Sequence, residues 1–198
     1  MQVATYGFDA TVDNKHLKDW QGRIVRWAVK RGRAALFEGT GLGKTLQQLV
    51  WSENIVKHVG PVLLICPLGV RLQTKDEATK FGIGCDVRLV QDQSECGPGI
   101  NITNYDRIDK FVANQFAGVC LDESAILKGL TSKTRKTLCE MFSNTNYRLA
   151  CTATPSPNDP TELGNHAEFL GVMKSVDMQT RFFYHDSGDT ASWILMPH

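Results

Sequence analysis

A glycine-rich loop constrains the fold of this chain more than any other stretch. Gly39–Thr45 lies between an apolar run, residues 34–37, and a segment with helical spacing that begins near Lys44. A strand, a glycine loop and a helix in this order leave backbone N–H groups free to surround phosphate oxygens. The lysine adds a positive charge for the β- and γ-phosphates, and the following Thr45 hydroxyl suits Mg²⁺. The sequence therefore predicts a phosphate-binding loop whose contacts come from Thr40, Gly41, Leu42, Gly43, Lys44 and Thr45.

One position departs from the strict pattern of such loops. The pattern asks for a glycine five residues before Gly43, and Glu38 stands there instead. The alternative interpretation is a glycine-rich turn followed by a chance Lys-Thr pair. The strand before the loop, the helix after it and an acidic pair further along the chain favour the nucleotide site.

Length, charge and cysteines exclude several classes of protein. A chain of 198 residues is long enough for one domain with a full core or for one lobe of a larger machine. A net charge of +1 gives no general basic field, so a nucleic-acid surface has to be local. Cys66, Cys120 and Cys151 sit inside apolar runs, and no C-x-x-C pair occurs, so we expect buried reduced thiols rather than disulfides or zinc.

The N-terminus and the hydropathy pattern argue against membrane targeting. Residues 1–5 carry no basic region, and no apolar run reaches the length needed to cross a bilayer. We therefore expect a cytoplasmic protein without a membrane partner.

Strand-like and helix-like segments alternate along the chain. A continuous apolar run predicts a strand at residues 62–66, and we expect further strands at residues 34–37, 86–90, 100–103, 117–121 and 147–151, with helical segments between most of them. Residues 181–198 have the pattern of a hairpin around 186–189. This alternation predicts an α/β fold with a mainly parallel sheet and helices on both faces.

Polar residues follow three of these strands directly. In open parallel sheets the carboxyl ends of the strands share one edge, where ligands bind. Asp122-Glu123 ends one strand, so Asp122 is a candidate for holding Mg²⁺ through water and Glu123 for activating the attacking water as a general base. A solvated acidic pair at a strand exit is the alternative, which Lys44-Thr45 upstream makes less attractive.

Two further candidates are ambiguous from their chemistry alone. Thr152-Ala153-Thr154-Pro155 follows the last strand, and its residue types favour a capped turn. Gln21 lies on an amphipathic helical segment before the loop, where its amide can both donate to and accept from adenine. A solvent-facing glutamine is the default interpretation of such a residue.

Taken together, these motifs resemble those of superfamily-two helicases. Gly39–Thr45, Leu121–Ala125 and Thr152–Pro155 are similar to motifs I, II and III, and the Gly41–Thr45 core is similar to the Swi/Snf-type branch of double-stranded DNA translocases. Weaker similarities are a Q-motif-like helix at Leu17–Gln21, motif Ia at Pro67-Leu68 and motif Ib at Ile102–Asp106. Ser124-Ala125 after the acidic pair and the lack of a tryptophan near Gln73-Thr74 depart from this branch, and a compact phage-type helicase also fits by analogy.

The resemblance implies a RecA-like fold, ATP and Mg²⁺ as cofactors, and movement along nucleic acid. It implies adenine recognition for Gln21 and coupling of hydrolysis to movement for Thr152 and Thr154. We divide the chain accordingly into an N-terminal extension at residues 1–16, a RecA-like ATP-binding lobe at 17–171, and the start of a truncated connection at 172–198. A second RecA-like lobe carrying the arginine finger is expected beyond His198.

The sequence supports the nucleic-acid contacts less strongly than it supports the nucleotide site. The loops after two strands place Pro67, Arg71, Thr103 and Asn104 where backbone N–H groups and basic side chains, including that of Arg107, can face phosphates. Solvated charges on surface loops are an equally good interpretation without the resemblance. Double-stranded DNA is the expected partner. The rival functions are a nucleotide-dependent scaffold that does not move DNA and a P-loop kinase or transferase.

Overall fold

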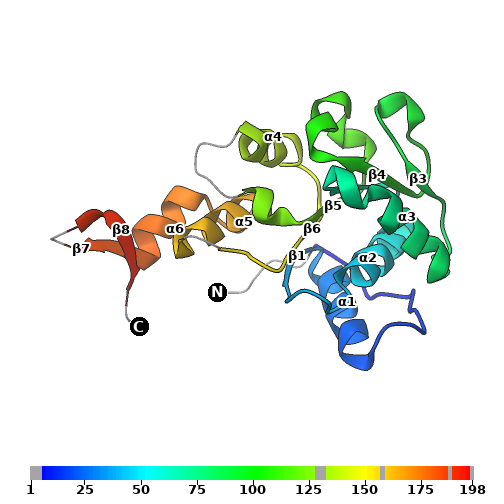
Figure 1. Ribbon diagram of the computed structural model, residues 1–198, viewed down its shortest axis with the longest axis horizontal. Helices are drawn as coiled ribbons and strands as arrows, with labels where there is room; N and C mark the ends of the chain where they lie inside the picture. The colour runs from blue at the N-terminus through cyan, green and yellow to red at the C-terminus, as the bar shows by residue number, and fades with distance from the viewer. Residues whose placement is uncertain (1–5, 128–132, 157–158, 187–188, 197–198) are drawn as a thin grey trace.

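A six-stranded parallel sheet forms the centre of the protein (Figure 1). The computed structural model describes residues 6–127, 133–156, 159–186 and 189–196. The strand order is β1-β6-β5-β2-β4-β3, and all five pairings are parallel, as the apolar runs predict. The strands are β1 (Arg33–Phe37), β2 (Val62–Cys66), β3 (Val87–Leu89), β4 (Ile100–Asn104), β5 (Gly118–Asp122) and β6 (Tyr147–Thr152).

Helices connect the strands on both faces of the sheet. They are α1 (Asp19–Arg31), α2 (Lys44–His58), α3 (Arg71–Lys80), α4 (Lys133–Met141), α5 (Leu163–Phe169) and α6 (Ser175–Phe182). Short 3₁₀ turns occupy Leu68–Val70, Gln93–Glu95, Tyr105–Lys110, Ala113–Gln115, Ser124–Leu127 and Pro160–Glu162. The segment after Asn104 is a 3₁₀ turn rather than an α-helix.

Successive side chains of the buried strands point to opposite faces of the sheet and so divide the core into two layers. In β2 the side chains of Val62, Leu64 and Cys66 pack with α1, α2 and α3, whereas Leu63 and Ile65 belong to the cluster that includes α4 and α5. All five residues are fully buried. A strand covered on both faces needs apolar residues at every position, which explains the unbroken apolar run in the sequence.

The cysteines are free thiols, as expected. Cys66, Cys120 and Cys151 lie in neighbouring strands β2, β5 and β6 and are fully buried. Burial raises the pKa of Cys66 to about 12, that of Cys85 to about 11 and that of Cys139 to about 11. It also raises the pKa of the half-buried Cys96.

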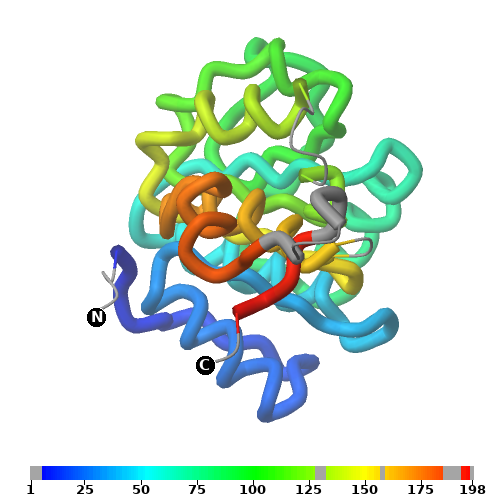
Figure 2. The backbone as a smooth tube through the Cα atoms, turned by 90° about the vertical axis from the view of Figure 1, so that its left-hand side faces the viewer, coloured from blue at the N-terminus to red at the C-terminus, as the bar shows by residue number. Residues whose placement is uncertain are grey.

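The C-terminal part of the chain forms an arm beside the sheet. Helix α6 leads into an antiparallel hairpin, β7 (Phe183–Asp186) and β8 (Asp189–Leu195), which confirms the expected hairpin; its turn lies outside the described residues. Figure 1 shows α5, α6 and the hairpin projecting from the strands, and Figure 2 views this arm end-on in front of the lobe. Within the described ranges, no helix has the length and hydrophobicity to cross a bilayer.

Candidate nucleotide-binding site

The carboxyl ends of β1 and β5 border an open cleft of about 550 Å³. The phosphate loop forms its floor, because β1 ends at Phe37 and α2 begins at Lys44. Gly41 and Gly43 have φ of 76° and 77°, left-handed values that an L side chain rarely adopts, so the loop needs glycine at both positions. The cleft is lined by His16, Lys18, Trp20, Gln21, Gly41, Leu42, Gly43, Lys44, Thr45, Leu46, Gln73, Glu77, Phe81 and Asp122.

The Lys44 amine lies over the loop. Its Nζ donates to the carbonyl oxygens of Glu38 and Gly39 at 2.8 and 2.9 Å, so the positive charge is held within the phosphate loop itself. Glu38, the atypical residue of this loop, accepts a hydrogen bond from Gln47 Nε2 at 2.7 Å. The carboxylate is therefore tied to the side of α2, and the departure from the strict glycine pattern is accommodated.

Asp122 faces the same cleft from the end of β5. Gln48 Nε2 donates to Asp122 Oδ1 at 2.7 Å, and the Tyr105 hydroxyl donates to the backbone oxygen of Asp122 at 2.7 Å. Burial raises the pKa of the Asp122 carboxyl, and the hydrogen bond from Gln48 opposes that shift. No sequence motif includes Gln48, although it lies one helical turn after Lys44 and therefore on the same face of α2.

Glu123 follows directly but lines a neighbouring hollow of about 380 Å³. The sheet edge thus brings both acids together, with Asp122 toward the phosphate loop and Glu123 toward Pro67, Tyr105 and Thr154. Glu123 has φ of 55°, and among the described residues it is the only non-glycine with positive φ. Such a conformation costs about 1 kcal/mol or more and is found mainly where function requires it.

The end of β6 holds Glu123 in place. The Thr152 hydroxyl donates to Glu123 Oε1 at 2.9 Å and accepts from the backbone N–H of Thr154 at 3.1 Å. Thr152 is fully buried, whereas Thr154 is exposed at the neighbouring hollow. The element is therefore a hydroxyl-closed turn, as its residue types favour, and it also contacts the acidic pair.

The residue after the acidic pair reaches across to α5. The Ser124 hydroxyl lies 3.1 Å from His166 Nε2, and both residues are buried. The His166 ring also packs edge-on against Phe37, with centroids 5.1 Å apart. Burial lowers the pKa of this histidine, so its neutral form is favoured. His166 was not among the residues singled out from the sequence, because a lone histidine on a helix carries no local signal.

Comparison with known families matches the SNF2-related domain to residues 20–183. The chain belongs to the SNF2-related domain family. A curated relative from Xenopus tropicalis, "SWI/SNF-related matrix-associated actin-dependent regulator of chromatin subfamily A-like protein 1", is 29% identical over 89% of this chain. A mouse relative, "Chromodomain-helicase-DNA-binding protein 1-like", is 31% identical over 74% of it. This chain spans 19% of the length of each of these two relatives.

Solved structures agree on the fold of this SNF2-related domain. The Sulfolobus solfataricus SWI2/SNF2 ATPase core, solved in complex with double-stranded DNA, superposes with a TM-score of 0.68 at 23% identity. It covers 92% of this chain, which corresponds to 41% of the Sulfolobus chain. The UvsW helicase from bacteriophage T4 gives a TM-score of 0.63 at 15% identity, covering 84% of this chain and 62% of its own. The parallel sheet is therefore the RecA-like sheet of these ATPase cores.

In this SNF2-related domain, Gln21 joins α1 to the phosphate loop. Its Oε1 accepts from the backbone N–H of Lys18 and its Nε2 donates to the carbonyl of Leu42, both at 2.7 Å. Gln21 lies at the cleft but is 6% exposed. Adenine recognition by this residue stays a prediction, and the structure adds a second role in fixing the loop.

The nucleic-acid candidates fall into two groups. Pro67 lines the hollow that holds Glu123, and Arg71 begins α3 with a half-buried side chain. Thr103 and Asn104, at the end of β4, are 0% and 3% exposed, so their side chains do not reach the surface. A contact with nucleic acid at these two positions would therefore use backbone N–H groups, and it stays a prediction.

Proposed function

We propose that this chain is the ATP-binding and hydrolysing motor lobe of a DNA helicase or translocase. The observation that carries the proposal is the convergence of Lys44, Thr45 and Asp122 in one cleft, with Glu123 next to Asp122 in the neighbouring hollow. Membership of the SNF2-related domain family supports the same conclusion.

The residues at the cleft fit a magnesium-bound nucleotide. Asp122 and Thr45 supply a carboxylate and a hydroxyl oxygen, the ligands that this hard cation prefers. Among the described residues no cluster of three or more metal-binding side chains occurs, which suits an ion held by one carboxylate, phosphates and water. When bound, Mg²⁺ would neutralise charge on the β- and γ-phosphates.

The protein's own groups then divide the work. Lys44 and the loop N–H groups bind the phosphates, while Gln48 orients Asp122. Glu123 accepts a proton from the attacking water, and the Thr152 hydroxyl fixes one oxygen of that carboxylate. A change in the Glu123–Thr152 contact would reach Thr154 through its N–H bond to the same hydroxyl, which is how these threonines would couple hydrolysis to movement.

A second RecA-like lobe would complete this site. The cleft is open, so water surrounds a bound triphosphate and weakens the electrostatic help that the loop provides. An arginine from a facing lobe contributes about 10³–10⁵ in rate in P-loop enzymes. Duplex DNA is the proposed track, since the related Sulfolobus core was solved with double-stranded DNA, and Pro67 and Arg71 are the proposed contacts on this lobe.

Calorimetry and phosphate release test this proposal. The chain should bind Mg-ATP detectably, hydrolyse it slowly and respond little to duplex DNA, whereas a longer protein with a second lobe should be fast and DNA-stimulated. Lys44→Ala should abolish detectable binding, because the loop loses its only lysine charge.

Three results would overturn parts of the proposed function. Absence of Mg-ATP binding would exclude the nucleotide site. Fast, DNA-stimulated turnover by residues 1–198 would exclude the need for a second lobe. ATP turnover without DNA movement in the longer protein would favour the scaffold function.

A further inference from the structure

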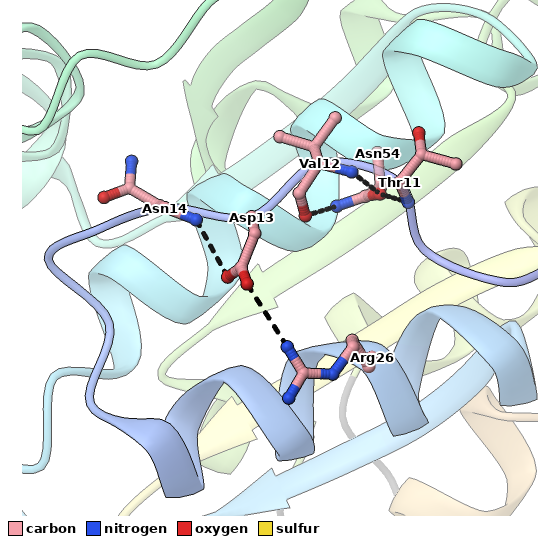
Figure 3. A network of polar contacts seen from close by, with 6 residues as sticks. All are labelled: Thr11, Val12, Asp13, Asn14, Arg26 and Asn54. Carbon is pink, nitrogen blue, oxygen red and sulfur yellow. Dashed lines mark hydrogen bonds and ion pairs between the residues drawn. The ribbon is translucent and has the colours of Figure 1, made fainter.

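The N-terminal residues are built into the lobe by a buried asparagine. Residues 6–16, which we call the strap, run between α1 and α2 (Figure 3). Asn54 of α2 is fully buried, and its Oδ1 accepts from the N–H groups of Thr11 and Val12, both at 3.0 Å. Its Nδ2 donates to the carbonyl of Val12 at 3.1 Å and to that of Val50 at 2.9 Å. One side chain therefore pairs three backbone groups of a segment that has no strand partner.

The ion pairs of the strap lie at the surface. Asp13 pairs with Arg26 at 3.3 Å and Asp9 with Lys30 at 2.9 Å, and all four side chains are largely exposed. Exposed ion pairs contribute on the order of 0–1 kcal/mol. By contrast, a buried amide without hydrogen-bond partners lowers stability considerably more. The hydrogen bonds of Asn54 are therefore the main polar contacts that hold the strap.

The other end of the strap reaches the nucleotide cleft. Asn14 Nδ2 donates to the carbonyl of Phe81 at 2.9 Å, and Asn14 Oδ1 accepts from the N–H of His16 at 3.0 Å. The His16 ring packs against that of Phe81, with centroids 5.4 Å apart. His16 and Lys18 then line the cleft together with Phe81.

The strap residues and the phosphate-binding residues line different parts of the same cleft. Lys44, Thr45 and Asp122 mark the phosphate and metal end, whereas His16, Lys18 and Phe81 belong to other segments that line the same cleft. A nucleoside triphosphate bound by the loop would extend its sugar and base toward that part. The strap is thus a wall of the site, although its fastening at Asn54 does not line the cleft.

We propose that Asn54 is a positioning residue for nucleotide binding, which fixes the strap so that His16 and Lys18 hold the base end of the nucleotide. This inference rests on the proposed nucleotide site. It extends that site to residues 6–16, which no motif of the sequence includes, and it predicts that loosening the strap weakens binding of the nucleoside but not of the phosphates.

Asn54→Leu is the test variant, and Asn101→Leu is its matched control. Asn101 on β4 is also fully buried, and its amide likewise holds a nearby backbone segment, through Gly97 N and O at 3.0 Å each, but it does not line the cleft. Both variants lose a buried amide of the same size. Calorimetry then compares Mg-ATP with inorganic tripolyphosphate, which has no base or sugar.

We expect Asn54→Leu to lower the affinity for Mg-ATP about tenfold, which corresponds to the loss of one good contact. Its affinity for tripolyphosphate should stay within about twofold, and Asn101→Leu should leave both affinities within about twofold. An equal loss for both ligands, an equal loss in both variants, or unchanged Mg-ATP binding by Asn54→Leu would overturn the proposal.

Hydrogen exchange on the unmodified protein tests the same idea without a substitution. Mg-ATP should slow exchange of the amides of residues 11–17, and tripolyphosphate should not. Equal protection by both ligands, or none by Mg-ATP, would contradict the strap as a wall of the site. If the unmodified protein binds neither ligand, the proposed nucleotide function itself fails, a result distinct from each of these.

Discussion

The two edges of the parallel sheet differ in whether their buried polar side chains have hydrogen-bond partners. At the amino edge, the Arg148 guanidinium is 2% exposed, and its three nitrogens donate to the carbonyl oxygens of Thr145, Phe169 and Ser143. At the carboxyl edge, Glu38, Gln47 and Gln48 each keep one buried side-chain oxygen for which the described part of the chain provides no hydrogen-bond partner. Each of the three uses its other polar atom in the network beneath the phosphate loop.

This difference separates a side chain whose polar atoms are all paired from side chains whose hydrogen bonding is incomplete. A buried polar atom without a partner costs about 1–3 kcal/mol, so a folded protein keeps several together only where something repays the cost. The strained backbone of Glu123 lies on the same edge. We therefore expect substitutions at the carboxyl edge to change function with little loss of stability, and those at the amino edge to do the reverse.

The largest effect should come from Glu123→Gln. The amide can still accept from the Thr152 hydroxyl but cannot take a proton from water, so phosphate release should fall about 10²–10⁴-fold while Mg-ATP binding persists. Steady-state phosphate release and calorimetry on the same preparation measure both. Glu140→Gln, which removes an exposed carboxylate on α4, is the control and should change neither. Loss of binding in parallel with turnover would assign Glu123 to the nucleotide itself.

Arg148→Met should affect stability instead. Three carbonyl groups lose a hydrogen bond from Arg148, two of these bonds being buried, and we expect the free energy of unfolding to fall by about 3 kcal/mol. Urea denaturation measures this, and Mg-ATP affinity of the folded variant should be unchanged. Arg33→Met is the comparison: its guanidinium also donates to the carbonyls of Asn146 and Thr145, but at 3.3 and 3.5 Å and from a half-buried position. A larger loss in Arg33→Met would contradict this view of the amino edge.

Gln48→Leu should have the smallest effect, confined to magnesium. Without the 2.7 Å hydrogen bond, Asp122 loses its fixed orientation, and removal of such a supporting contact lowers metal affinity about 10-fold. ATP binding titrated with and without Mg²⁺ reports it as a ratio. Gln47→Leu removes a neighbouring amide that bonds Glu38 and should leave that ratio unchanged. The comparison of the two edges fails if Gln48→Leu destabilises the fold as strongly as Arg148→Met.

Much of the lobe was predictable because its strands are buried on both faces. A continuous apolar run such as residues 62–66 leaves few alternatives, and α2 begins and ends where Gly43 and Gly60-Pro61 require. Helix α6 was not predictable in the same way: it contains polar residues on most positions, and Val176 is 64% exposed. Its place depends on packing against α5, which a local pattern does not show.

The motif residues of the site were predictable, but the residues that hold them in place were less so. Lys44, Asp122 and Glu123 follow from the rule that strand ends share an edge, although the rule does not say that the two acids would face different hollows. Gln48 contacts Asp122, which is 74 positions away in the chain. Asn54 contacts the backbone of Thr11 and Val12, which are 43 and 42 positions away. A glutamine or asparagine in a helix carries no mark of such a distant partner, so these roles emerge only from the fold.

The buried thiols have a practical consequence for spectroscopy. Maleimides react with thiolates, and burial keeps Cys66, Cys85 and Cys139 protonated at neutral pH by raising the pKa of each to about 11 or 12. A cysteine introduced at an exposed position, such as Val176 on the arm, would be accessible to the reagent. A fluorophore could thus be attached at one chosen point of the protein without first removing Cys66, Cys85 or Cys139.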